Sequence, residues 1–259
     1  MPFVTARDGV RLHFEIEGDG APLLLHLGAG CDSDLWREAG YVATLAKNYQ
    51  CILFDHRGHG ASDNPREVAA YHVDRFVDDI QALLDHLGID STHFFGWSNG
   101  LLVGSAAAAK LPARIRSLIL FGAVGRPLAA AALAEATERR IAALRAGGWD
   151  WLINAFTEEE GECPAWMQDR IRATDLEQLL LWQRARLDWE ITPWDLVVGT
   201  PSPSLVLVGD LEDPEHLMTE VAAGMKDGIE ARLLGLGHIK SFLASDLVLP
   251  HVEAFLGNH

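Results

Sequence analysis

Short apolar runs alternate along the chain with longer segments of helical periodicity. The runs are nearly continuous in apolar residues, which is typical of strands covered on both faces. They lie at 22–27, 50–55, 92–97, 114–122 and 204–209, with a further strand-like run at 229–234. The segments with a helical pattern are 36–47, 74–88, 99–111, 215–225 and 240–256. This alternation predicts an α/β fold built on a doubly wound, mostly parallel sheet.

Two regions depart from the alternation. Residues 4–16 alternate in polarity around Asp8-Gly9, a turn dipeptide that predicts a hairpin and so antiparallel strands at one edge of the sheet. Residues 127–200 show a helical pattern without a strand-like run. We predict that they form a helical cap (lid) over a core made of 1–126 and 201–259.

The predicted cap is rich in tryptophan. It holds six of the eight tryptophans of the chain, namely Trp149, Trp151, Trp166, Trp182, Trp189 and Trp194. Aromatic rings carry a large apolar surface, so we expect the cap to line a pocket for a small to medium, apolar substrate.

Composition narrows the classes of partner. With 37 acidic and 21 basic residues, the 259-residue chain has a net charge of −16, which disfavours nucleic acid and anionic membrane surfaces. The three cysteines lack CxxC spacing, and no signal peptide or membrane-spanning run is visible, so we expect a cytoplasmic protein. No metal or organic cofactor is expected, because neither a ligand-spaced His/Cys cluster nor a phosphate-binding glycine loop occurs. A homodimer could form through the cap or an edge strand.

The segment Gly96-Trp97-Ser98-Asn99-Gly100 is a GxSxG motif. It follows a predicted buried strand and opens a helix of small residues, which is the setting that this motif requires around a nucleophilic serine. The glycines permit a sharp turn with close neighbours, and the turn would lift the Ser98 hydroxyl clear of the sheet. The backbone N–H of Asn99 would then point towards a substrate oxygen.

A serine hydroxyl needs a base that is itself oriented by an acid. The best candidate base is His238, which follows the last strand-like run, at the sheet end where Ser98 is expected. The acid should come from the loop after 204–209, which offers Asp210, Glu212 and Asp213. We favour Asp213, because Asp210 lies very close to the strand end and has less reach towards an imidazole.

Five segments, in this order along the chain, resemble motifs of the α/β-hydrolase superfamily. They are LLLHLGAG, FDHRGHGASD, GWSNG, LVGDLEDP and GLGHIKSF, and the resemblance extends from about residue 3 to residue 257. It is to the lid-bearing branch of esterases, enol-lactonases, C–C hydrolases and cofactor-free haloperoxidases. The resemblance implies an eight-stranded sheet and a Ser-acid-His triad, an order that neither chymotrypsin nor subtilisin has.

The resemblance also implies roles for individual residues. Ser98 matches the nucleophile and His238 the base, and Asp213 matches the acid through the proline that follows it. The loop is one residue longer than usual, which leaves Asp210 and Glu212 open. Asn99 matches one donor of the oxyanion hole. The second donor belongs to the loop after 22–27, where we expect it at Ala29, with Gly28 or Leu27 as alternatives.

These residues predict a serine hydrolase that cleaves an ester, lactone or related carbonyl bond of a small molecule through an acyl-enzyme. The same triad could support C–C bond hydrolysis, perhydrolysis or cyclisation, because fold and triad do not fix the substrate. The alternative that is not an enzyme is a protein of the same fold that binds a ligand without turning it over.

Overall fold

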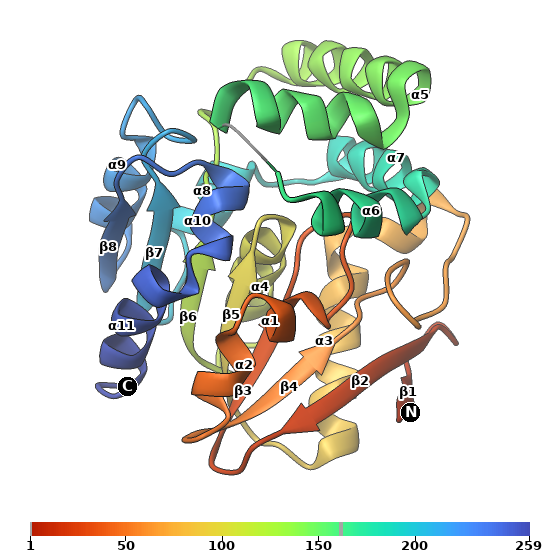
Figure 1. The fold of residues 1–259 in the computed structure, drawn as a ribbon. Coiled ribbons are helices and arrows are strands. Elements are labelled where there is room, and N and C mark those ends of the chain that lie inside the picture. The colour runs from red at the N-terminus through yellow and green to blue at the C-terminus, as the bar shows by residue number, and fades with distance from the viewer. Residues whose placement is uncertain (1, 161–162) are drawn as a thin grey trace.

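One eight-stranded sheet forms the centre of the computed structural model, which describes residues 2–160 and 163–259 (Figure 1). Its strand order is β1-β2-β4-β3-β5-β6-β7-β8, with β1 and β2 antiparallel at one edge and parallel pairing from β4 to β8. The strands are β1 (Phe3–Thr5), β2 (Arg11–Glu17), β3 (Ala21–His26), β4 (Tyr49–Phe54), β5 (Thr92–Trp97), β6 (Ile115–Phe121), β7 (Ser204–Gly209) and β8 (Gly228–Leu233). The predicted doubly wound sheet and N-terminal hairpin are therefore confirmed.

Helices cover both faces of the sheet. One face packs against α1 (Leu35–Glu38), α2 (Tyr41–Leu45), α10 (His238–Leu243) and α11 (Ser245–Leu256). The other packs against α3 (Val73–Leu87), α4 (Asn99–Lys110), α8 (Pro193–Val198) and α9 (Leu217–Gly224), with the short 3-10 helix η1 (Val68–Tyr71) beside α3. Because successive strand residues point to opposite faces, Leu23 and Leu25 enter the first layer and Leu24 the second.

Two predicted helices are each divided in two. The segment 36–47 is interrupted at Gly40, whose φ of 87° lies in the left-handed region that glycine adopts without strain. The segment 240–256 is interrupted at Ala244, where φ and ψ are −85° and 54°. The first of its halves, α10, begins at His238.

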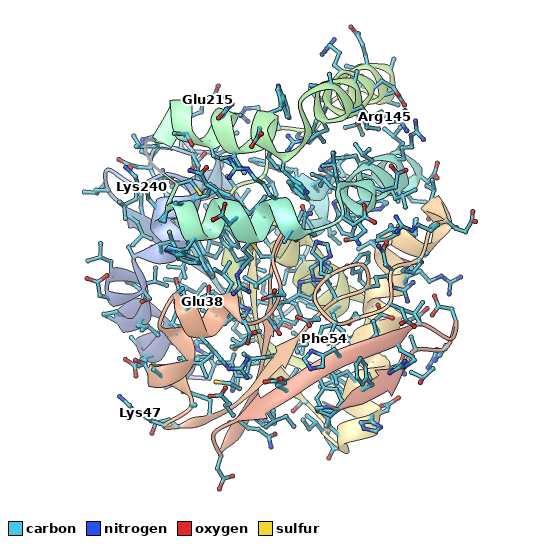
Figure 2. The ribbon with its side chains drawn as sticks, turned by 45° about the vertical axis from the view of Figure 1, so that its right-hand side comes forward. Glu38, Lys47, Phe54, Arg145, Glu215 and Lys240 are labelled. Atoms are coloured by element: carbon cyan, nitrogen blue, oxygen red, sulfur yellow. The ribbon has the colours of Figure 1, made fainter. Side chains whose placement is uncertain are left out.

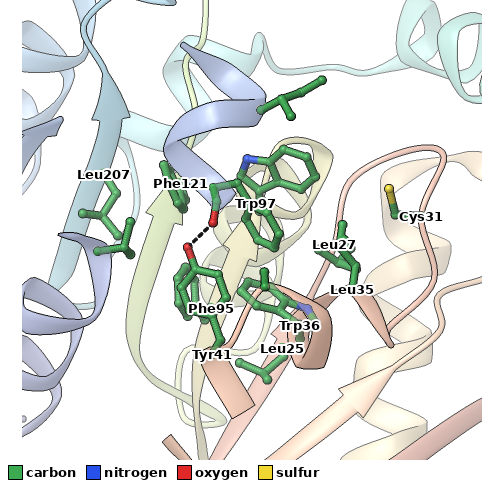
Figure 3. Packing of buried hydrophobic residues seen from close by; sticks show 14 of the residues in the cluster. Leu25, Leu27, Cys31, Leu35, Trp36, Tyr41, Phe95, Trp97, Phe121 and Leu207 are labelled. Atoms are coloured by element: carbon green, nitrogen blue, oxygen red, sulfur yellow. Dashed lines mark hydrogen bonds between the residues drawn. The ribbon is translucent and has the colours of Figure 1, made fainter. Parts of the chain in front are cut away.

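An aromatic cluster fixes α10 against the sheet (Figure 3). The Tyr41 hydroxyl donates to the backbone carbonyl of Phe242 over 2.7 Å. The Phe242 ring stacks on Trp97 with 4.2 Å between centroids, and the Trp36 ring lies edge-on to it at 5.1 Å. All four side chains are buried. The helix that begins with His238 is thus held by a dense part of the core.

Between β6 and β7, residues 127–200 contain only helices among the residues described there, and we call this segment the helical insertion. It comprises α5 (Ala130–Glu160), which bends at Gly148, then α6 (Ala165–Ala173), α7 (Leu176–Ala185), the 3-10 helix η2 (Arg186–Asp188) and α8. Helices α5, α6 and α7 lie over one end of the sheet (Figure 1), and side chains fill the space between them and the core (Figure 2). Within the described residues, no helix combines the length and apolar character needed to cross a bilayer.

Candidate active site

Ser98 occupies the turn between β5 and α4 with φ and ψ of 59° and −121°. A positive φ on a side-chain-bearing residue costs of order 1–3 kcal/mol, and the flanking glycines are what permit it here. A Cβ on Gly96 would lie 2.3 Å from the Gly100 carbonyl oxygen, and one on Gly100 would lie 2.4 Å from the His26 carbonyl oxygen. The two motif glycines are therefore required by close backbone packing, as the sequence predicted.

Two further glycines border Ser98. A Cβ on Gly28 would lie 2.4 Å from the Ser98 Cβ and 2.8 Å from its Oγ, so the loop after β3 passes directly beside the hydroxyl. A Cβ on Gly122, after β6, would lie 3.6 Å from both the backbone nitrogen of Ser98 and Cε1 of His238. Serine and histidine thus meet at this end of the sheet.

The imidazole of His238 is held by a carboxylate and by two aromatic rings. Its Nδ1 lies 2.7 Å from Oε2 of Glu212, and the other oxygen of Glu212 accepts from the backbone N–H of Gly209 over 3.2 Å. The rings of Trp97 and Phe156 stack on the imidazole with centroid distances of 4.9 and 5.3 Å. When Nδ1 carries the ring proton and donates a hydrogen bond to Glu212, Nε2 is left as the basic nitrogen.

The prediction that Asp213 orients the histidine is wrong in its geometry. The Asp213 carboxylate accepts from the backbone N–H groups of Leu217 and Met218 over 2.7 and 3.0 Å, and from the Arg232 guanidinium over 2.6 Å. It therefore fixes the start of α9, and both of its oxygens are used by these partners. Glu212, which the sequence left open, takes the place beside the imidazole.

Asp210, the third acid of the loop, forms hydrogen bonds to the segment that precedes His238. Its Oδ1 accepts from the backbone N–H groups of Gly235 and Leu236 over 2.6 and 3.2 Å, so it braces the loop that leads to His238. No local signal in the sequence separates Asp213 from Glu212, because Asp213 lies three residues before His216, the N-cap residue of α9.

The loop after β3, where the second oxyanion donor is predicted, passes beside Ser98. Of the three proposed donors in it, Ala29 lines the cavity beside Ser98, whereas Leu27 is buried and its carbonyl is bonded to Nδ1 of His26 over 2.8 Å. Asn99 lines the same cavity and begins α4, where first-turn N–H groups have no partner within the helix. Both predicted donors therefore border the same space.

A neighbouring histidine fixes this loop. The backbone N–H of Gly30 donates to Nε2 of His59 over 3.1 Å, and the Gly30 carbonyl accepts from the Thr174 hydroxyl over 3.1 Å. Burial lowers the pKa of His59 to about 4, and that of His26 to the same value, so both rings are neutral at pH 7. Between them, the His56 ring stacks on His26 with 4.7 Å between centroids and lies tilted against His59 at 3.9 Å.

Two cavities meet at Ser98. The inner cavity, of about 70 Å³, is walled mainly by apolar side chains of the insertion and the core, and also by Arg140. The outer cavity, of about 350 Å³, is bordered by Glu212, Arg126 and Arg186. Both cavities are lined by Ser98, Asn99 and His238. A molecule that occupies both would carry its reactive bond at the serine.

The expectation that cap tryptophans line the pocket holds only in part. Trp149 lines the inner cavity, and its ring packs over Gly30 of the loop after β3. Trp151 and Trp166 are exposed. Cys31 also borders the inner cavity, but burial raises the pKa of its thiol to about 12, which keeps it protonated. Over residues 2–160 and 163–259, no three His, Cys, Asp or Glu side chains converge as a metal site requires.

Comparisons with known proteins agree with this architecture. A family model described as the alpha/beta hydrolase fold matches residues 21–193. The 3-oxoadipate enol-lactonase 2 of Acinetobacter baylyi is 35% identical over 119 residues, which is 45% of this chain and 43% of that protein. The chain thus matches less than half the length of this curated relative.

Solved structures align over nearly the whole chain. A hydrolase from Pseudomonas aeruginosa PA01 superposes with a TM-score of 0.83 at 23% identity, covering 99% of this chain and 98% of the other. A thermophilic esterase from Thermogutta terrifontis gives the same TM-score, identity and coverage. At these identities the likeness extends to the fold alone.

Proposed function

The chain belongs to the α/β-hydrolase fold family, and we propose that it is a serine hydrolase which cleaves an ester, lactone or related carbonyl bond. The proposal depends chiefly on one observation. A serine in a strained strand–helix turn shares two cavities with a histidine whose other nitrogen lies 2.7 Å from a carboxylate. This is the arrangement that activates a hydroxyl towards a carbonyl.

Each residue then has a defined step. His238 Nε2 takes the proton of Ser98 as Oγ attacks the carbonyl carbon, and Glu212 stabilises the imidazolium through Nδ1. The N–H groups of Ala29 and Asn99 stabilise the oxyanion. Collapse of the tetrahedral intermediate then breaks the bond to the leaving oxygen, and this oxygen receives the proton from His238. Water, deprotonated by His238, then attacks the acyl carbon; the bond to Ser98 Oγ breaks, Oγ receives the proton from His238, and the acid is released.

The two cavities indicate what the substrate looks like. An inner cavity of about 70 Å³ is smaller than the ~150 Å³ cavity known to enclose benzene, so as it stands it fits a short acyl group. The outer cavity, of about 350 Å³, has room for a larger leaving group. Longer acyl groups would require the helical insertion to move, which is the role of a lid.

Labelling with a fluorophosphonate, followed by intact-mass measurement, tests the proposal. We expect one adduct on the wild type, at Ser98, and none on Ser98→Ala. The variant should also lose about 10³-fold or more in kcat/KM for 4-nitrophenyl acetate. Ser105→Ala, which removes a buried hydroxyl of α4 that donates to the Leu101 carbonyl, is the matched control and should label normally.

Two results would count against this function. One is an adduct that persists on Ser98→Ala, which would move the nucleophile elsewhere. The other is a wild type that neither labels nor turns over any ester, which would favour a homologue that only binds its ligand.

A further inference from the structure

Two arginines of the helical insertion border the site. Arg140 lies on α5 and lines the inner cavity, whereas Arg186 begins η2 and lines the outer cavity. Both cavities include Ser98, so the two side chains approach the serine from adjoining spaces. Helix α5 and η2 contact each other, and the charge of Arg140 acts on Arg186. The two arginines therefore border the candidate nucleophile's cavities from two sides, close enough for one charge to act on the other.

Neither guanidinium forms an ion pair with a carboxylate of the described residues, unlike Arg139 and Arg126. Arg139, the next residue on α5, pairs with Glu135. Arg126 also borders the outer cavity, but it binds both oxygens of Glu220, at 2.9 and 3.2 Å. Arg145 on α5 and Arg184 on α7 also form no ion pair among the described residues, but neither lines a cavity at Ser98.

The surroundings of the two arginines disfavour their positive charge. Burial lowers the pKa of Arg186 to about 10, and the positive charge of Arg140 contributes to the shift. Surrounding protein atoms also lower the pKa of Arg140, although part of its side chain reaches solvent. The Trp189 ring lies 5.9 Å from the Arg186 guanidinium carbon and supports it, but it supplies no full negative charge. An anion between the two arginines would relieve this repulsion.

On the basis of the proposed hydrolase function, we propose that Arg140 and Arg186 bind a carboxylate of the substrate, which is therefore a carboxylate-bearing ester or lactone. A planar carboxylate matches the parallel N–H groups of a guanidinium. Arg140, which would hold the group from one side, lines the inner cavity of about 70 Å³. The apolar side chains of the same cavity, among them Leu152 and Ile153, would cover the hydrocarbon part.

Two matched pairs of esters test this. One pair is 3-acetoxybenzoate and its methyl ester, with the charge on the leaving group. The other is 4-nitrophenyl hydrogen glutarate and its methyl ester, with the charge on the acyl group. The wild type should prefer the anionic member of at least one pair.

Arg140→Gln and Arg186→Gln should each lower kcat/KM for the preferred anionic ester by about 10- to 100-fold, the range for losing a charge-assisted hydrogen bond. Its neutral partner should change by less than about 3-fold. Arg139→Gln, whose side chain is turned to solvent and paired with Glu135, is the matched control and should behave as wild type. Arg140→Lys keeps the charge and should recover part of the loss.

A binding measurement keeps this proposal separate from the hydrolase function. Calorimetric titration of glutarate into Ser98→Ala measures the affinity of the arginine site for a carboxylate without turnover. Adding Arg140→Gln to that variant should weaken glutarate binding about 10-fold or more. The proposal is overturned if the wild type prefers the neutral esters and the glutamine variant binds glutarate as its parent does. Missing fluorophosphonate labelling would contradict the hydrolase function instead. Glutarate binding that depends on Arg140 would still support the carboxylate site.

Discussion

The two sides of the site are fixed in different ways. On the sheet side, Ser98 is held by backbone geometry and Glu212 and His238 by mutual hydrogen bonds, with glycines at every close approach. On the insertion side, Trp149 and Phe156 are held mainly by packing, and two arginines have no carboxylate partner among the residues described. The proposed chemistry needs atoms placed within about 0.5 Å, and the sheet side carries the groups that would perform it. Phe156 of the insertion side also supports His238, but the rest of its cavity wall carries no proposed catalytic group and so is suited to selecting substrates.

The largest effect on rate should come from substituting one of the two neighbouring acids of the sheet side, Glu212 and Asp213. Glu212→Gln keeps the shape of the side chain but removes the charge that stabilises the imidazolium, so kcat should fall by about 10³- to 10⁴-fold. Asp213→Asn should lower kcat by less than about 10-fold, because this carboxylate contacts Arg232 and the start of α9. It should instead reduce the free energy of unfolding by about 1–3 kcal/mol.

Kinetics with 4-nitrophenyl acetate and urea denaturation of both variants would measure this division. Equal losses of kcat, or a larger loss in Asp213→Asn, would show that the geometry of the loop misassigns the acid.

These two acids also show which features of the fold and site can be predicted from the sequence. Parallel strands, the hairpin and the serine turn were all predictable, because their signals are local: apolar runs, Asp8-Gly9, and glycines spaced around Ser98. The position of His238 followed from its place after the last strand, and the structure brings it to Ser98. Each of these inferences needed only the neighbouring residues and the topology of the sheet.

The rest depends on the direction in which side chains leave the backbone. Glu212 and Asp213 are adjacent, and only the path of the loop between β7 and α9 decides which one meets the imidazole. Phe156 and Arg140 reach the site from α5, whose bend at Gly148 and position over the sheet are set by tertiary packing. No periodicity in the sequence encodes such long-range contacts.

A smaller loss of rate should follow from filling the close approach beside the serine. In Gly28→Ala, the new Cβ would lie 2.8 Å from the Ser98 Oγ, which must displace either the hydroxyl or the loop that carries Ala29. We expect kcat to fall by about 10²- to 10³-fold, the effect of losing one oxyanion donor. The fold should persist, because the change is confined to one loop.

Gly125→Ala is the matched control for this variant. Gly125 borders the outer cavity, but a Cβ there meets nothing within 4 Å, so its rate should stay within about 3-fold of wild type. If Gly28→Ala turned over 4-nitrophenyl acetate as fast as the control, the sheet side would be less rigid than its contacts indicate.

The smallest effect expected is a dependence of stability on acid, which should arise on the sheet side. His59 accepts a hydrogen bond from the Gly30 N–H through Nε2. Protonating that nitrogen therefore breaks a hydrogen bond that holds the loop after β3. Burial lowers the folded-state pKa of His59 and of His26 to about 4, below the unfolded value near 6.5. Between these two values the unfolded chain binds more protons, so stability is complete above pH 6.5 and is lost as the pH falls towards 4.

Urea denaturation at several pH values would measure this loss. Between pH 7 and pH 5 each of the two histidines should cost about 2 kcal/mol of unfolding free energy. His59→Gln should be less stable than wild type at pH 7, yet its loss between pH 7 and pH 5 should be smaller by about 2 kcal/mol. His251→Gln, at an exposed position on α11, should leave the pH dependence unchanged. If His59→Gln kept the wild-type slope, protonation of the ring would not be what loosens the loop beside Ser98.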